Sequence, residues 1–322
     1  MKRFILNTLL FTLFTLSLIG LIVVCINVVI YRNAFIKLNP DIKYIVLGHS
    51  HPETAFNDSL ITQFSNNSAS GESYFYTLAK TKLLFKHNNN IETVFIELSN
   101  NQISMKMDEW IWGDINVDSR IKFYGPFIDM EGYNLLLKKN PFGLINSIAV
   151  STKKNPFFFI NKSFDYKRLG KYFYLMKNKT DSLVRESKLK QIDLDSFRQV
   201  SNYNMNYLKK LINFCESKNK KVYLIRSPLH EKYEGYINET IYKNIIATEF
   251  KDIEFLDFSK YPLTNAEFAD LEHLNFTGAI KFSKWFNKLL NEDNILSKKD
   301  KQKYIDLEIN QEKAKNVQSV LN

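Results

Sequence analysis

The chain has 322 residues, of which 45% are hydrophobic and 14% aromatic, so it can fold around a substantial core and is not a disordered protein. Its net charge of +10 favours anionic surroundings, such as a lipid head-group surface. The basic residues are scattered, without an arginine-rich run or a recognisable nucleic-acid-binding module, which excludes nucleic acid as the expected partner.

A membrane-spanning helix is predicted near the N-terminus. After Lys2 and Arg3, residues 4–31 contain no charged side chain, whereas a bilayer core needs only about 20 apolar residues in a helix. The segment is too long for a signal-peptide core, and no small-x-small cleavage pattern follows it. The basic residues on its two sides nearly balance. Its short head nevertheless favours a single-pass signal anchor in the inner (cytoplasmic) membrane, with the C-terminal domain extracytoplasmic, or periplasmic.

The next segments alternate between predicted strands and helices. Residues 32–43 form a linker. Buried strands are predicted at 44–48, 93–98, 221–226 and 253–258, and helices at 72–87, 196–221 and 276–292. Strands that alternate with helices indicate a parallel sheet with right-handed crossovers. We therefore expect an α/β domain over residues 44–296, built as a three-layer α/β/α sandwich.

Two regions depart from this alternation. Residues 103–195 are aromatic and interrupted by Gly and Pro, and they are interpreted as a mostly helical insertion that forms a cap or a groove wall. Its aromatic side chains serve either as packing or as a sugar-stacking platform. Residues 297–322 are charged and predict a solvated helix or a frayed end. Cys25 lies in the apolar segment and Cys215 in a predicted soluble helix, so no internal disulfide is expected.

Polar residues follow the predicted strands, and in an open parallel sheet ligands gather at the carboxyl ends of the strands. These residues are Gly48-His49-Ser50-His51, Ser99-Asn100-Asn101, Arg226 to His230, and the turn "DLEHLNFTG" at 270–278. A serine that attacks an ester needs a base, and the base needs an orienting carboxylate. Asp270 and His273 are three residues apart in a turn, so Ser50, His273 and Asp270 form a workable catalytic triad.

At these residues the sequence resembles the SGNH, or GDSL-like, hydrolases and acyltransferases. The family has a Gly-Asp-Ser turn after its first strand, a glycine in a second block, a Gly-x-Asn-Asp turn in a third block and a late Asp-x-x-His. The matching positions here are Gly48-His49-Ser50, Gly71, Asn100-Asn101 and Asp270-Leu271-Glu272-His273. The resemblance covers about residues 44–100 and 220–290. It implies an SGNH-like sandwich with flavodoxin-like strand order.

The resemblance also implies roles for these residues. Ser50 would be the nucleophile, His273 the general base and Asp270 its partner. The oxyanion hole would consist of the Ser50 and Gly71 backbone N–H groups and the Asn100 side chain. His49 replaces the family's non-catalytic Asp. Leu98 replaces the glycine of the third block, which leaves open whether Asn100 or Asn101 is the equivalent residue.

Other polar residues near the strand ends have alternative interpretations. His51, Asn101, Arg226 and His230 are possible substrate-binding residues, and Arg226 could equally be a buried partner of a carboxylate such as Glu97. A metal site of His49, His51, Asp270 and His273 is a weaker alternative, because two histidines on alternate sides of an extended turn usually point apart. No metal or cofactor is expected.

The leading hypothesis is a membrane-anchored serine esterase or O-acyltransferase that acts on O-acyl groups, most simply acetyl, of envelope or exported glycans. Its expected partners are the bilayer, through residues 4–31, a glycan or acylated small-molecule substrate, and a membrane acyl donor. Two alternatives remain open. One is a non-catalytic SGNH-like protein that binds glycan or scaffolds an assembly system. The other is a metal-dependent phosphoesterase.

Overall fold

A five-stranded sheet organises the chain in the computed structural model, which describes residues 1–161, 164–166, 169–176, 179–186 and 197–321. All strands are parallel, in the order β2-β1-β3-β4-β5. They are β1 (Tyr44–Leu47), β2 (Phe64–Asn66), β3 (Thr93–Glu97), β4 (Lys221–Arg226) and β5 (Phe255–Asp257). This order is one of the two common doubly wound arrangements, in which ligands bind beyond the carboxyl ends of the strands.

Helices cover both faces of the sheet, because alternate side chains of each strand enter different cores. Ile45 and Leu47 belong to a core with α3 (Tyr74–His87), α10 (Asn202–Ser217) and α11 (Glu239–Glu249). Val46 belongs to a second core on the other face, with α2 (Ser50–Ala55), α12 (Phe276–Asn287) and α13 (Lys301–Leu321). The strands are therefore buried on both sides, as their nearly continuous apolar sequences predict.

Short turns complete the α/β part of the chain. These are the 3-10 turns η1 (Asp58–Leu60), η2 (Gly125–Phe127), η3 (Glu234–Asn238), η4 (Asn265–Glu267) and η6 (Ile295–Ser297), and the π-helical turn η5 (Lys288–Glu292). The π-helical turn continues α12 directly, so the predicted helix at 276–292 is present with a change of hydrogen-bonding pattern in its last five residues.

The predicted α/β class with a parallel central sheet is confirmed, and so are its four predicted strands. The edge strand β2 was not predicted, because its three residues, Phe-Ser-Asn, carry no apolar run. The C-terminal segment is helical, but it is not purely solvated, since Ile305 and Ile309 are buried against the second core. Residues 187–196, where the predicted insertion ends and the predicted helix at 196–221 begins, lie outside the described residues.

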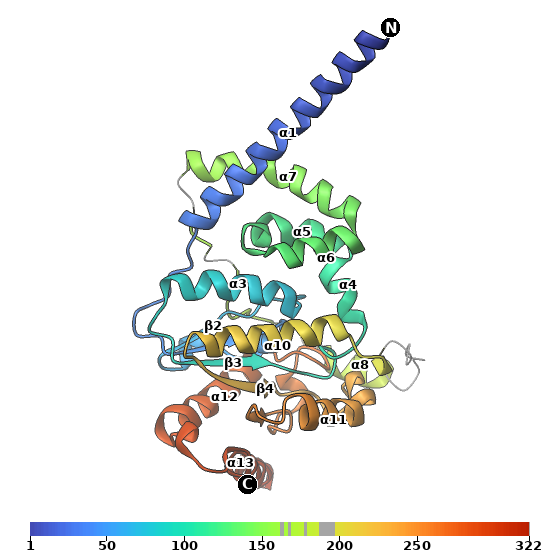
Figure 1. Ribbon diagram of the computed structural model, residues 1–322. Helices are drawn as coiled ribbons and strands as arrows, with labels where there is room; N and C mark the ends of the chain where they lie inside the picture. The colour runs from blue at the N-terminus through green and yellow to red at the C-terminus, as the bar shows by residue number, and fades with distance from the viewer. Residues whose placement is uncertain (162–163, 167–168, 177–178, 187–196, 322) are drawn as a thin grey trace.

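The N-terminal helix α1 (Lys2–Asn33) extends away from the α/β part, as Figure 1 shows. It contains an 18-residue window of mean hydropathy 2.8, none of which is buried, and it is long enough to cross a membrane. Its last turn differs, since Ile30 is fully buried in the core that also contains α3. The helix is therefore an exposed apolar rod that is held by the folded domain at its C-terminal end.

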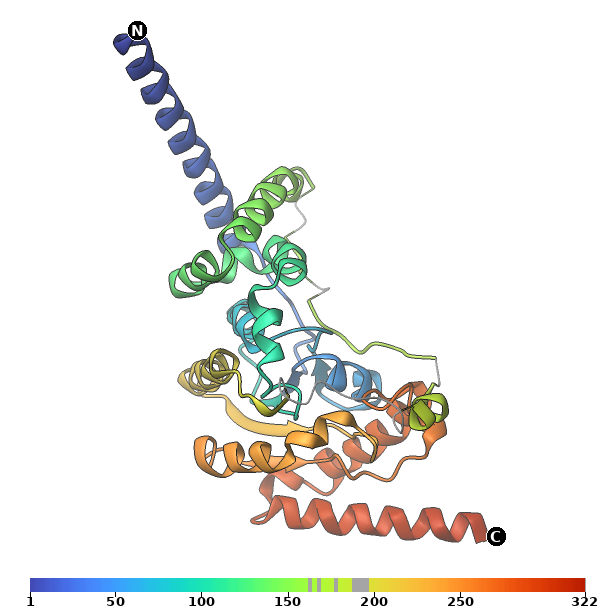
Figure 2. The same cartoon turned by 90° about the vertical axis from the view of Figure 1, so that its right-hand side faces the viewer.

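The insertion forms a layer of helices between α1 and α3 (Figures 1 and 2). It comprises α4 (Lys106–Trp112), α5 (Asp114–Tyr124), α6 (Met130–Lys139) and α7 (Pro141–Ile160), and α8 (Thr180–Glu186) follows. Most of this layer stands on the α1 side of the molecule, whereas a cap would lie over the strand ends. The extended residues 169–176 do reach the strand ends, where Lys171 N–H donates to Ser68 O and Phe173 N–H to Glu53 O. That the insertion forms a groove wall stays a prediction.

A buried ion pair supports the turn that follows β2. Lys80 Nζ lies 2.6 Å from Glu72 Oε2, and both side chains are almost completely inaccessible. Lys80 Nζ also donates to Asn67 O, and Glu72 accepts from Tyr124 Oη and Thr77 Oγ1. Removing one partner of such a pair leaves an uncompensated buried charge.

We predict that Lys80→Ala lowers the free energy of unfolding by about 3–5 kcal/mol, because Glu72 then remains buried without its cation. The matched control is Lys82→Ala on the same helix, whose partner Asp129 is half exposed. That change should cost less than about 1 kcal/mol. Denaturant titration of both variants in detergent measures the difference. Equal effects of the two substitutions would contradict a special role for the buried pair.

Candidate active site

Strand β1 is followed by Gly48, and any other residue at this position would force its neighbours to move. Gly48 has φ +156°, and a Cβ built there would lie 2.6 Å from Glu97 Cβ and 2.9 Å from Pro52 Cγ. The backbone therefore passes closely over the end of β3. This close approach places His49, Ser50 and His51 at the carboxyl ends of the central strands, where α2 begins.

The structure brings together the three residues of the predicted triad. Ser50 Oγ lies 2.7 Å from His273 Nε2. On the other side of the ring, His273 Nδ1 lies 2.9 and 2.8 Å from the two carboxylate oxygens of Asp270. With Nδ1 donating to the carboxylate, Nε2 is free to accept the serine proton, which is the arrangement of a nucleophile, a base and an orienting acid.

The turn at residues 270–273 fixes the base through several further bonds. Asp270 Oδ1 accepts the backbone N–H groups of Glu272 and His273, each at 2.8 Å. Burial alone would raise the pKa of Asp270, but the hydrogen bonds and the charge interaction with His273 leave it below its ordinary value. The carboxylate is consequently ionised at neutral pH and holds His273 in one orientation.

Gly71 occupies the turn after β2, beside the strand that carries Ser50. Ala69 N–H donates to Gly48 O at 3.0 Å, which joins this turn to the start of the nucleophile loop. Gly71 has φ +68°, in the left-handed region, and a Cβ there would lie 3.2 Å from both Trp110 and Arg120. A glycine is therefore required, and α4 and α5 close the outer side of the turn.

Asn100 does not face the triad. Its Nδ2 donates to Asn238 Oδ1 at 3.1 Å and to Glu239 Oε2 at 2.8 Å, and its Oδ1 accepts from Arg226 Nη1 at 3.2 Å. The residue is fully buried. Both amide hydrogens and the carbonyl oxygen are thus committed to a structural network. The prediction that Asn100 supplies the oxyanion hole is wrong for this reason.

Asn101 is the asparagine that the site offers instead, and His49 helps to orient it. Ser99 Oγ donates to Asn101 Oδ1 at 2.8 Å and lies 3.0 Å from His49 Nε2. Because the hydroxyl has one proton, which it gives to Asn101, it must accept the Nε2 proton of His49. This chain of hydrogen bonds, from His49 through Ser99 to Asn101, is called the relay. It fixes the carboxamide oxygen of Asn101 and leaves its NH₂ group as the available donor.

His49 is suited to this relay because it is neutral. Burial, followed by the charges of His51 and His273, holds the pKa of His49 well below its ordinary value. The proton on Nε2 is thus that of a neutral tautomer, not of an imidazolium. His49 thus orients Asn101 through Ser99, from the sequence position where the resembled family has Asp.

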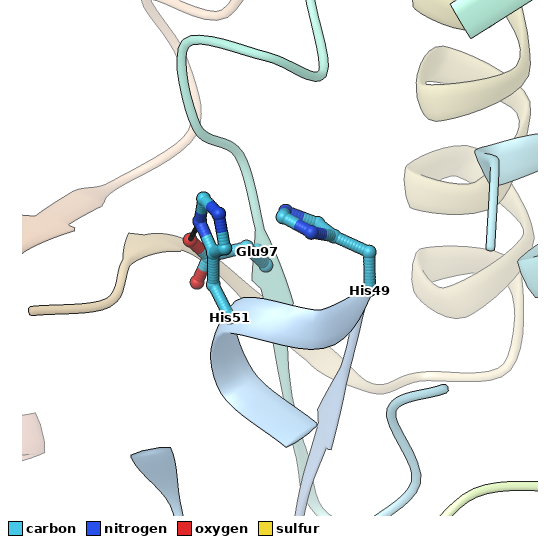
Figure 3. A group of neighbouring side chains, drawn as sticks. All are labelled: His49, His51 and Glu97. Carbon is cyan, nitrogen blue, oxygen red and sulfur yellow. Dashed lines mark ion pairs between the residues drawn. The ribbon is translucent and has the colours of Figure 1, made fainter. Parts of the chain in front are cut away.

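His51 lies between two carboxylates and is inaccessible to a substrate. Its Nε2 is 3.3 Å from Glu272 Oε2, and its Nδ1 is 3.8 Å from Glu97 Oε1 (Figure 3). Burial acts to lower the pKa of His51, but the hydrogen bond with Glu272 and the nearby carboxylates of Glu272 and Glu97 outweigh it and raise the pKa to about 9. The prediction that His51 contacts the substrate is wrong, because its side chain is 0% exposed.

Glu272 links His51 to the turn that carries the base. In the sequence Asp270-Leu271-Glu272-His273, the aspartate holds His273 and the glutamate holds His51, the neighbour of Ser50. Burial raises the pKa of Glu272, but its interaction with His51 more than offsets this and leaves the pKa below its ordinary value. The Glu272–His51 pair and the Ser50–His273 hydrogen bond therefore connect α2 to the turn at 270–273.

Two groups of side chains have the composition of a metal site. His49, His51 and Glu97 form one, and His51, Glu272 and His273 form the other, with ligand atoms within 4.8 Å of one another. In the first group both Glu97 oxygens already accept from the Ser227 backbone N–H, and one of them from its hydroxyl. In the second group both ring nitrogens of His273 are engaged in the triad. An ion at either place would replace these hydrogen bonds, so the residues fit a hydrogen-bonded network better than a metal.

The two remaining candidates for substrate binding differ in their surroundings. Arg226 is 3% exposed and is paired with Glu239 and Asp257, so it is a structural residue and not a substrate contact. His230 Nε2 lies 2.9 Å from Asn265 Oδ1, and His230 lines a cavity of about 590 Å³ that also contains Tyr236, Tyr261 and Lys260. A role of His230 in binding stays a prediction.

The sequence analysis missed three functional candidates: Ser99, Glu97 as the partner of His51, and Glu272. Glu272 had a signal, since it lies inside the Asp-x-x-His motif. Glu97 had a different one, because a glutamate at the end of an apolar strand must find a partner when it is buried. Ser99 had none, because a serine after a strand is common in turns.

We predict that Asn101→Ala lowers kcat for ester hydrolysis by about 10²–10³-fold, the usual effect of losing one oxyanion donor. Its unfolding midpoint should stay near that of the wild type. Asn100→Ala should instead lower the unfolding midpoint and have the smaller effect on kcat. It breaks a buried network and so destabilises the fold by about 1–3 kcal/mol. Ester-hydrolysis kinetics and thermal unfolding of both variants distinguish the roles, and an exchange of the two phenotypes would refute the assignment.

We predict that His51 makes stability depend on pH. Its folded-state pKa of about 9 lies above the ordinary 6.5, so its contribution is complete below about pH 6.5 and is lost as pH rises through 9. The shift corresponds to roughly 3 kcal/mol. Unfolding of the wild type and of His51→Gln should be compared between pH 6 and pH 10. The difference between them should shrink with rising pH, and a constant difference would show that His51 is neutral throughout.

Comparison with known proteins gives no function for this arrangement. A protein-family model whose description states no function matches residues 173–295, which is less than half of the chain but includes Asp270 and His273. The comparison with curated proteins finds no match.

Proposed function

We propose that the protein is a membrane-anchored SGNH-like serine esterase or O-acyltransferase that acts on O-acyl groups of envelope or exported glycans. The observation that carries the proposal is the continuous hydrogen-bonded chain from Ser50 through His273 to Asp270. The order of these residues along parallel strand ends also follows the SGNH pattern, and the strand order 2-1-3-4-5 agrees with an SGNH-like sandwich.

In the first half of the reaction, Ser50 Oγ attacks the carbonyl carbon of the acyl ester, and its proton moves to His273 Nε2. Asp270 stabilises the imidazolium that forms. The negative charge on the carbonyl oxygen is met by the Ser50 and Gly71 backbone N–H groups and by Asn101 Nδ2. Collapse of the tetrahedral intermediate breaks the bond to the alcohol oxygen. His273 returns the proton to that oxygen, and the acyl group stays on Ser50.

In the second half, a hydroxyl group attacks the acyl-serine, and His273 accepts its proton. When water attacks, the products are a free acid and Ser50, and the protein is an esterase. When a sugar hydroxyl attacks, the acyl group is transferred to it, and the protein is an O-acyltransferase. Both reactions use the same residues, so the choice depends on whether an acceptor displaces water from the site.

The proposed location follows from α1. The helix would cross the inner membrane once, with the catalytic domain on the extracytoplasmic side, where envelope glycans and a membrane acyl donor are accessible. The apolar, unburied window of α1 supports an anchor. Tyr174 is exposed and stacks on Phe276, three residues after His273, with ring centroids 5.0 Å apart, which suits a glycan substrate.

The alternative of a non-catalytic scaffold is less well supported. A scaffold needs neither a base aligned on a serine nor a carboxylate aligned on the base, and here both contacts are 2.7–2.9 Å long. Its best arguments were the departures from the family pattern at Gly48-His49 and at Leu98, of which the first is His in place of Asp. The first argument weakens because His49 positions Asn101 through Ser99.

A fluorophosphonate probe that reacts with activated serines tests the proposal. We expect it to label the wild type and His49→Asn, and to leave Ser50→Ala unlabelled, because Ser50 is the serine aligned on the His273–Asp270 pair. His273→Ala should slow labelling by at least about 10³-fold. The exposed Ser297 provides a matched control, since Ser297→Ala should label like the wild type.

Equal labelling of the wild type and Ser50→Ala would remove Ser50 from the mechanism. Labelling that is lost after dialysis against a chelator, and restored by a divalent metal, would favour the metal-dependent alternative. Transfer of a radiolabelled acetyl group to an oligosaccharide, compared with its release as acetate, separates the transferase from the esterase.

A further inference from the structure

Helix α7 exposes four of its large apolar side chains and buries two of its serines. Phe142, Ile145, Phe157 and Ile160 are 85%, 59%, 60% and 74% exposed. At about 100° per residue, these four positions fall within about 120° of one another around the helix. They therefore lie on one side of α7, two near each end, with the exposed residues Asn146, Ala149 and Lys153 between them on the same side.

The opposite side of α7 contains serines. Ser147 and Ser151 are buried against the neighbouring helices, together with Leu144. A surface helix of a water-soluble protein shows the reverse order, with its apolar stripe against the core. An exposed stripe of two phenylalanines and two isoleucines is therefore unfavourable in water and indicates a contact with another apolar medium.

The position of α7 identifies that medium. The 20 residues from Phe4 to Val23 span about 30 Å as a helix, which is the thickness of a bilayer core. Val23 and Val24 are also the first residues of α1 that line a groove with the insertion. Helix α7 crosses α1 in this region and is the part of the folded domain nearest the exposed part of α1 (Figures 1 and 2).

The charges beside the stripe are those of a helix at a lipid head-group surface. Lys138 and Lys139 end α6 immediately before α7, and Lys153 lies on the exposed side of α7 itself. Long lysine side chains can keep their apolar stems beside the lipid while the ammonium groups reach anionic head groups. Lysines next to exposed apolar side chains are favoured at the surface of an anionic bilayer.

We propose that α7 is an interfacial helix, whose stripe of Phe142, Ile145, Phe157 and Ile160 is embedded in the surface of an anionic bilayer. This inference rests on the proposal that α1 spans the membrane. With α1 as one contact and α7 as a second, the domain cannot rotate freely about its anchor. The triad is then held at a fixed height and direction relative to the membrane.

Depth-dependent quenching in lipid nanodiscs tests this inference with the full chain. Single cysteines at Phe142 and Ile160 are introduced in a Cys25→Ser background and labelled with a small fluorophore, since Cys215 is buried and unreactive. The nanodiscs contain phosphatidylglycerol and a lipid with a nitroxide on its acyl chain. A label at Phe11→Cys in α1 reports whether the anchor lies in the bilayer. Leu307→Cys on α13, an exposed leucine at the far end of the domain, is the matched control.

We expect the labels at 142 and 160 to be quenched at least twofold more than the label at 307, and the label at 11 to be quenched strongly. Quenching at 11 without quenching at 142 and 160 would overturn the α7 inference and leave the anchor intact. Absence of quenching at 11 as well would refute the anchor. Energy transfer between 142 labels on different molecules, without lipid quenching, would assign the stripe to a second copy and overturn the inference.

Discussion

The hydrogen bond between Ser50 and His273 joins two parts of the chain that are 223 residues apart, and the rest of the site depends on it. One end is fixed by Gly48, which lets the chain pass directly over Glu97. The other end is fixed by the backbone N–H groups that Asp270 accepts. Behind the site, Ser283 Oγ of α12 donates to Ala55 O of α2. The two helices that flank the triad thus move as one unit.

The triad could be predicted because it depends only on topology. Strands that alternate with helices form a parallel sheet, and parallel strands deliver their following residues to one edge. The choice between Asn100 and Asn101 could not be predicted in the same way. Asn100 and Asn101 are the two central residues of a turn that the Gln102 N–H closes on Ser99 O, and their side chains have different surroundings, so one residue of offset decides which amide meets the substrate. That offset depends on how the chain turns after Leu98, and the apolar pattern does not specify this.

The predictions for His51 and for the insertion were limited because the sequence does not show which side chains are buried. From the sequence, His51 is a polar residue next to a nucleophile, and contact with a substrate was a reasonable expectation. Its charge state and its isolation follow from Glu97 and Glu272, which come from separate segments. The insertion shows the same limit, because its aromatic composition fits a cap, a groove wall or a membrane contact. The exposed apolar side chains of α7 are recognised only when the exposure of each residue is known.

The two histidines beside Ser50 differ in charge at neutral pH, His49 being neutral and His51 positively charged, because their surroundings differ. Their ring centroids are 4.2 Å apart, so protonation of both would place two like charges together in a buried site. His51 has two carboxylate neighbours and keeps the proton, and its charge in turn helps to keep His49 neutral. A neutral His49 can donate through Nε2 to Ser99 and so orient Asn101, while a charged His51 can hold Glu272 and the turn of the base. In the proposed mechanism, the pattern His-Ser-His therefore positions the oxyanion donor with one side chain and the turn of the general base with the other.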